Sequence, residues 1–122
     1  MKEESVWNDS EDMKNAVRHW ADRIGVQVRE IHLRDMRRKW ASISLNGRLT
    51  LSTDLVSLPK ALGEYVIVHE LVHLLAPNHG VLFKSYMSAY LPDWEDRQRA
   101  LQFSPALPSR SSSLTKGELE GD

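Results

Sequence analysis

The amino-acid sequence predicts a small α+β domain, and three observations lead to this fold class. An amphipathic helical pattern near the N-terminus precedes short alternating segments typical of strands, and an apolar helical segment follows in the second half. The 122 residues have room for one domain with one core. We expect residues 1–103 to contain an N-terminal helix, a three-stranded antiparallel sheet, a long central helix and two C-terminal helices.

The first helix is predicted over residues 10–24. Asp9 or Ser10 can act as its N-cap, acidic residues occupy the first turn, and Gly25 stands just past its end. Trp7, which precedes the cap, is expected to pack as a hydrophobic staple. One stripe of the helix is apolar and should face the core, since its members recur at helical spacing: Ala16, Val17, Trp20 and Ile24.

A first strand and a hairpin are predicted next. Apolar residues at positions 26, 28, 31 and 33 indicate the strand, and residues 39–52 suit a hairpin around Asn46-Gly47. A three-residue loop, Leu45-Asn46-Gly47, pairs Ile43 with Leu49 and Ala41 with Leu51. A two-residue loop would instead put Leu49 on the face of Ser44. We predict the three-residue loop because it leaves one face of the hairpin apolar.

The remaining chain favours three helices and a tail. The central helix should begin near Pro59 and run to about Leu75, a second should span Val81–Tyr90, and a third should begin around Asp93. From residue 104 the composition changes to proline, serine, glycine and charged residues, which predicts a disordered tail over residues 104–122. An alternative is that this tail folds over the cleft as an inhibitory segment.

The pattern His69-Glu70-Leu71-Val72-His73 in the central helix indicates a metal site. Residues four apart share a helix face, so His69 and His73 can both reach a zinc ion at about 2.0–2.1 Å. Glu70 lies one position round and can reach a water held by the metal without being a ligand. The surrounding segment is apolar almost throughout, and burying these polar groups would be costly without a partner such as a metal.

His79 is the predicted third ligand. Catalytic zinc usually takes three protein ligands, and Pro77-Asn78 has turn chemistry that can send the chain back over the site. His79 would then approach the metal from a different direction than the helical pair. The alternative third ligand is a downstream carboxylate, for which three candidates exist: Asp93, Glu95 and Asp96.

Several segments of the chain resemble the YgjP-like and SprT-like zinc metallopeptidases. The residues that carry the resemblance are Val66–Gly80 with Phe83, Lys39–Ser42, Gly47–Leu51 and Leu91–Trp94, so that it covers about residues 37–101. The resemblance implies a zincin-like domain, one Zn²⁺ per chain with His69, His73 and His79 as ligands, and Glu70 as the catalytic residue. The segment after Trp40 departs from the family's frequent Gly-Ser-Cys-Ser, since it reads Ala41-Ser42-Ile43-Ser44.

The predicted function is that of a zinc metalloendopeptidase acting on peptides or proteins. Zinc lowers the pKa of its bound water toward about 7, and Glu70 can take the proton as the water attacks the carbonyl and pass it to the leaving amine. The hairpin edge, with Ser42 and Ser44, is expected to pair with extended substrate. Asp93 is expected either to support a zinc-bound histidine or to cap a helix. The alternative function is a non-catalytic, zinc-stabilised module that binds protein or DNA partners.

Charge and composition limit the binding partners and the cellular location that we expect. The net charge of −1 does not indicate nucleic-acid or membrane binding, and the absence of cysteine excludes disulfides and thiolate ligands. The polar N-terminus lacks a signal core and no stretch is long enough to span a membrane, so we expect a cytoplasmic monomer. A basic run gives weak support for nucleic acid, although a solvated turn is the commoner explanation: Arg34, Arg37, Arg38 and Lys39.

Overall fold

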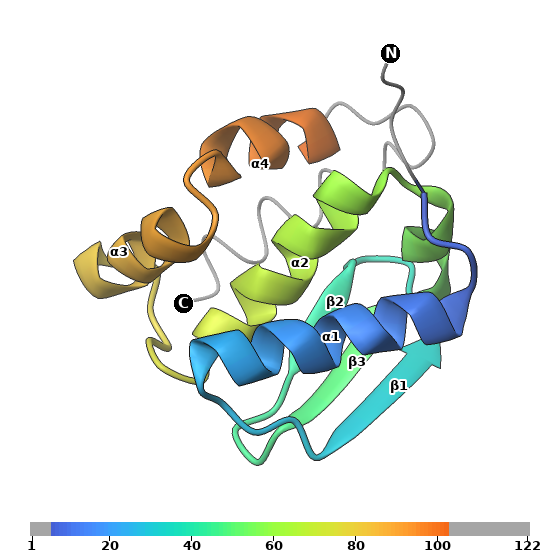
Figure 1. The fold of residues 1–122 in the computed structure, drawn as a ribbon, viewed down its shortest axis with the longest axis horizontal. Helices are drawn as coiled ribbons and strands as arrows, with labels where there is room; N and C mark the ends of the chain where they lie inside the picture. The colour runs from blue at the N-terminus through green and yellow to red at the C-terminus, as the bar shows by residue number, and fades with distance from the viewer. Residues whose placement is uncertain (1–5, 103–122) are drawn as a thin grey trace.

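The computed structural model describes residues 6–102, and the predicted tail at 104–122 lies outside them. The α+β prediction is confirmed. Figure 1 shows α1 and α2 in front of the sheet, with α3 and α4 beside α2. The elements in chain order are α1 (Ser10–Ile24), β1 (Glu30–Arg34), β2 (Ala41–Ile43), β3 (Arg48–Ser52), the 3₁₀ helix η1 (Thr53–Ser57), α2 (Lys60–Val72), α3 (Val81–Tyr90) and α4 (Trp94–Gln102).

Helix α1 begins and ends where the sequence predicts. The Asp9 carboxylate accepts a hydrogen bond of 2.9 Å from the backbone N–H of Asp12, which satisfies one of the first orphan donors of the helix. Gly25 ends the helix in the left-handed conformation, with φ 85°, and its N–H donates to the carbonyl of Ala21. The buried stripe of α1 packs against α2.

The sheet is mixed, which corrects the prediction of a fully antiparallel one. Strands β2 and β3 form the predicted hairpin, with Ala41 opposite Leu51 and Ile43 opposite Leu49, and Gly47 has the positive φ of 92° that the three-residue loop needs. Strand β1 pairs with β3 in parallel, and the strand order is β1-β3-β2. Four of the five residues of β3 are buried, which suits its central position in the sheet. Strand β1 pairs with the side of β3 opposite to β2.

Helix α2 forms the centre of the core. Ten of its residues are buried, and it packs against α1, α3, α4, β2 and η1. It ends at Val72, before the predicted Leu75, because the backbone tightens: the N–H groups of residues 73, 74 and 75 each donate to the carbonyl three residues earlier. His73 is therefore the C-cap residue of α2 rather than a residue of its interior.

Gly63 and Glu64 of α2 contact the N-terminal segment, α1 and α4. Trp7, only 5 % exposed, lies against Gly63, where an added Cβ would stand 2.7 Å from the Trp7 Nε1 atom. The carboxylate of Glu64 accepts hydrogen bonds from Trp20 Nε1 at 3.3 Å and Arg97 Nη1 at 3.2 Å, which joins α1, α2 and α4. Within residues 6–102 no helix has the length and apolar character required to cross a membrane.

Candidate metal centre

Three histidine side chains converge at the C-terminal end of α2. His69 comes from the last turns of α2, His73 from its C-cap, and His79 from the segment that leads to α3. Each offers one ring nitrogen, and these three atoms all lie within 4.8 Å of one another. The Nε2 atoms of His69 and His79 are 3.3 Å apart. The structure thus brings together the three histidines that the sequence singles out.

The turn after α2 brings His79 back over the helix. Ala76 is buried and its N–H donates to the carbonyl of Val72 at 2.8 Å, so the chain stays against the end of α2 before Pro77 diverts it. Gly80 then begins α3 as its N-cap residue. His79 therefore lies between a helix end and a helix start, and it approaches the other two imidazoles from outside α2.

The Nδ1 atoms of the two α2 histidines have partners that orient their rings. Nδ1 of His69 lies 3.2 Å from the Tyr65 hydroxyl, and Nδ1 of His73 lies 3.3 Å from the carbonyl oxygen of Ala76. A proton on Nδ1 that is donated to such an oxygen leaves the lone pair on Nε2, the tautomer that binds a metal. Sequence reasoning missed both partners, although Tyr65 stands four residues before His69 and so shares its helix face.

Phe83 supplies an apolar wall for the cluster. It is 2 % exposed, and its ring centroid lies 5.1 Å from that of His69, 4.9 Å from that of His73 and 4.7 Å from that of His79. An aromatic ring in contact with all three imidazoles restricts their rotation and excludes water from one side. All three imidazoles are therefore packed against Phe83, and those of His69 and His73 are also oriented by hydrogen bonds.

One nitrogen–nitrogen distance in the cluster has the length expected of a tetrahedral metal site. Two ligands at 2.0–2.1 Å in tetrahedral geometry stand about 3.3–3.4 Å apart. The 3.3 Å separation of the His69 and His79 Nε2 atoms matches that edge. Three neutral imidazoles are a donor set that suits zinc and other divalent transition metals.

Glu70 is a buried acidic residue of α2. Its residue is 2 % exposed and directly follows His69 on α2. A carboxylate in such an apolar helix is costly to bury unless it serves the polar centre next to it. The end of α2 therefore carries a buried carboxylate next in sequence to a histidine of the cluster.

The downstream acids stand apart from the three histidines. Asp93 Oδ1 accepts a hydrogen bond of 2.9 Å from Arg97 Nε, and Asp96 pairs with Arg99. Within residues 6–102, the group of potential metal ligands contains neither of these acids nor Glu95. Asp93 directly precedes α4, and its carboxylate is bonded to the Arg97 side chain of that helix.

The other charged residues noted in the sequence lie on exposed surfaces. The basic run lines a hollow of about 350 Å³ on the loop between β1 and β2, together with Asp35 and Met36. His32 Nε2 lies 2.7 Å from Glu30 Oε1, and this hydrogen bond, followed by the charge of Arg48, lowers the pKa of the Glu30 carboxyl. None of these groups belongs to the histidine cluster.

Fold and cluster together define an α+β domain with a three-histidine group that could hold a metal ion. A family model described as the YgjP-like metallopeptidase domain matches residues 8–103. The chain belongs to the YgjP-like family, as its resemblance predicts, and this membership together with the three-histidine group indicates a metal ion and a peptide-hydrolysing function. The predicted likeness to SprT-like proteins stays a prediction. No curated protein matches the chain in sequence.

Two solved structures share the fold, and each is of a metallopeptidase zymogen. Abylysin from Pyrococcus abyssi is 22% identical with a TM-score of 0.67, and the match covers 74% of this chain and 91% of that one. Jannalysin from Methanocaldococcus jannaschii is 24% identical with a TM-score of 0.65, covering 71% of this chain and 90% of that one. These similarities support the predicted small zincin-like domain.

Proposed function

We propose that this protein is a zinc-dependent endopeptidase. The observation that carries the proposal is the convergence of three imidazole nitrogens within 4.8 Å of one another, and the buried Glu70 directly follows one of these histidines on α2. Its membership in a metallopeptidase family supports peptides as substrates. Zinc is the proposed metal because three histidines with one remaining position for water are its usual catalytic donor set.

His69, His73 and His79 are the proposed zinc ligands. When the Nδ1 protons of the first two rings are donated to the Tyr65 hydroxyl and the Ala76 carbonyl, each Nε2 is left free to bind the metal. Zinc bound there would supply Lewis acidity and lower the pKa of a coordinated water toward about 7. His79 completes the set from the loop, so the three ligands are divided between a rigid helix and a turn.

Glu70 is the proposed general base and acid. Its carboxylate accepts the proton of the attacking water and then delivers that proton to the amine nitrogen of the leaving group. Both transfers need a single carboxylate adjacent to the cluster, and Glu70 is the neighbour of His69 in the chain. Its burial limits exchange of that proton with bulk water.

Strand β2 is the proposed docking edge for an extended substrate. Within the described sheet it pairs on one side only, with β3, and it packs against α2, which carries the cluster. Backbone pairing along such an edge gives affinity that does not depend on side chains. Because an edge admits chain on both sides of the cleaved bond, it favours internal cleavage.

The Glu70→Gln variant tests the enzyme proposal. Removal of a general base should lower kcat by about 10²–10⁴-fold, while zinc content and the fold stay unchanged. The alternative, a non-catalytic zinc-stabilised module that binds protein or DNA, predicts that the variant performs as the wild type does in every assay. Cleavage by Glu70→Gln at the wild-type rate would remove the enzyme proposal.

The ligand assignment has its own test. Purified His79→Ala protein should contain much less zinc than the wild type, whereas Glu95→Ala, an exposed change on α4, should contain the same amount. Metal analysis of both variants decides between the two. Zinc loss in the Glu95 variant alone would overturn His79 as the third ligand.

A further inference from the structure

The connection from β1 to β2 carries a dense group of positive charges around its surface hollow of about 350 Å³. Four of the six residues that line this hollow are cationic, and all four are exposed. Within residues 6–102 none of the four forms an ion pair with a carboxylate. The six residues, which we call the basic loop, are Arg34, Asp35, Met36, Arg37, Arg38 and Lys39.

Both ends of the basic loop meet the same residue of the central strand. Arg34, the last residue of β1, stands opposite Ser52 in the parallel pair of β1 and β3. Trp40, which directly follows the basic loop, is buried, and its carbonyl accepts a 2.8 Å hydrogen bond from the N–H of Ser52. Because β1 and β2 lie on opposite sides of β3, the basic loop crosses the end of β3. Its cations are therefore gathered over one strand end.

The charge of the basic loop is opposite to that of the rest of the chain. The loop holds four positive charges and one negative charge, whereas the whole chain has a net charge of −1, so the remaining residues are net acidic. Three of the four cations are arginines, whose planar guanidinium can bind a carboxylate through two parallel hydrogen bonds. The acidic remainder repels a long polyanion, whereas a short acidic stretch would contact the loop alone.

Two further observations favour an acidic polypeptide over a nucleic acid as the partner. Proteins stack the bases of single strands on exposed aromatic rings, but Trp40, the aromatic residue that adjoins the basic loop, is 0% exposed. The basic loop also continues into β2, whose outer edge is unpaired in the described sheet. Lys39 stands two residues before Ala41, so their Cα atoms are at most about 7.6 Å apart. Such an edge pairs with polypeptide backbone.

We propose that the basic loop is a docking surface for an acidic stretch of a partner protein, in which several glutamate or aspartate side chains lie close together. Their carboxylates pair with the four cations of the loop. The residues that follow this stretch in the partner then lie beside the free edge of β2. The inference does not rest on the proposed peptidase function, because this docking needs neither the metal nor Glu70.

Titration with matched peptides tests the proposal. A labelled peptide of alternating glutamate and serine is compared with its glutamine counterpart on the zinc-loaded full-length protein at physiological ionic strength, and mass spectrometry verifies that both peptides stay intact. An exposed ion pair contributes up to about fivefold in affinity, so several pairs should lower the Kd of the acidic peptide by about tenfold relative to the neutral one. This difference should shrink toward unity at about 1 M salt. Equal Kd values for the two peptides would overturn the proposal.

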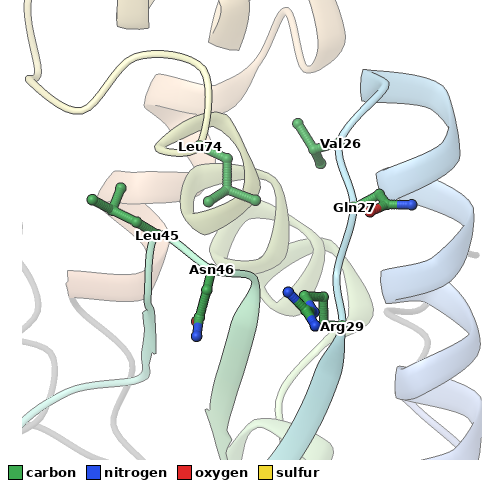
Figure 2. A pocket seen from close by; sticks show the side chains of 6 residues that line it. All are labelled: Val26, Gln27, Arg29, Leu45, Asn46 and Leu74. Carbon is green, nitrogen blue, oxygen red and sulfur yellow. The ribbon is translucent and has the colours of Figure 1, made fainter.

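Arg37→Glu and Arg29→Glu form a matched pair of variants. Both arginines are exposed and undergo the same change of charge. Figure 2 shows Arg29 in the lining of a different hollow, of about 360 Å³, which also contains residues of the hairpin tip. Arg29 lies at the opposite end of β1, about 16 Å from Arg34, so salt largely screens it from the basic loop. Arg37→Glu should raise the Kd of the acidic peptide by about threefold or more, and Arg29→Glu should leave it unchanged. An equal loss in both variants, or an unchanged Kd in Arg37→Glu, would refute the docking surface.

A nucleic-acid titration decides between the two classes of acidic partner. A single-stranded DNA oligonucleotide with as many negative charges as the acidic peptide replaces that peptide in the same experiment. Weaker binding of the oligonucleotide than of the acidic peptide supports a polypeptide partner. Tighter binding of the oligonucleotide would assign the basic loop to nucleic acid and overturn the proposal. Because these experiments measure binding and not cleavage, their outcome is independent of the test of the peptidase proposal.

Discussion

The Tyr65→Phe variant tests how the protein orients its metal ligands. The change removes the hydroxyl that lies 3.2 Å from His69 Nδ1, and both residues are only 2 % exposed. A net hydrogen bond contributes about 0.5–1.5 kcal/mol, or a factor of about 2–13 in an equilibrium constant. Loss of an outer partner of a metal-bound histidine typically costs 10–100-fold in affinity. The ranges overlap near tenfold, and we expect the Kd for Zn²⁺ to rise by about that factor.

Competition with a chromophoric zinc chelator measures this change. Tyr90→Phe is the control, because Tyr90 is a partly buried tyrosine at the end of α3 that makes no hydrogen bond or ring contact with the three histidines within residues 6–102. Its Kd should equal that of the wild type, and thermal unfolding of the metal-free proteins should show that both variants fold. An unchanged Kd in Tyr65→Phe, or the same loss in Tyr90→Phe, would refute the orienting role of the hydroxyl.

Three further predictions concern packing and metal binding. Gly63→Ala places a Cβ 2.7 Å from Trp7 Nε1, so overpacking of about 1–3 kcal/mol should outweigh a helix-propensity gain of about 1 kcal/mol. Denaturant unfolding should show a net loss, and a gain would mean that Trp7 moves aside at no cost. Phe83→Ala should cost about 3–5 kcal/mol in the same assay, whereas Leu82→Ala, at a residue 56% exposed, should change stability little. Chelation of zinc should lower Tm, by the equivalent of about 2.7 kcal/mol when zinc had been present at 100 times its Kd. His79→Ala should shrink that difference, and a wild-type response would contradict its role as a ligand.

Local rules predicted those elements whose determinants are close in sequence. The limits of α1 follow from Asp9 and Gly25, which act within one turn of the helix ends. The hairpin register follows from Gly47 and from the requirement that Leu49 and Leu51 share a face. In both cases the physical cause lies within a few residues of the element it sets.

The order of the strands in the sheet could not be predicted from local sequence rules. The alternating pattern of β1 is compatible with either direction of pairing, and its neighbour β3 follows only after the intervening β2. Burial decides the outcome, because β3 is the most buried strand and gains most from neighbours on both sides. Which of the three strands takes the central position therefore depends on the packing of the whole sheet.

In the candidate site, too, some features follow from local sequence and others depend on the packed structure. Helical spacing predicted that His69 and His73 would meet, and the turn chemistry of Pro77-Asn78 favoured His79 over a downstream acid. The contacts that orient the rings of His69 and His73 depend instead on the packed geometry of Tyr65 and Ala76. The domain limits, the monomeric state, the cytoplasmic location and the inhibitory tail stay predictions from sequence.

The placement of α2 at the centre of the core gives the three ligands unequal mobility. Amide hydrogens of α2 around His69 should exchange with solvent only when the whole molecule unfolds, since this helix packs against elements on several sides. Amides of the segment that carries His79, with its exposed Pro77, Asn78 and Gly80, can exchange through local opening. Deuterium uptake should therefore slow most in this segment when zinc is added, because the metal fastens a loop to a helix that is already rigid.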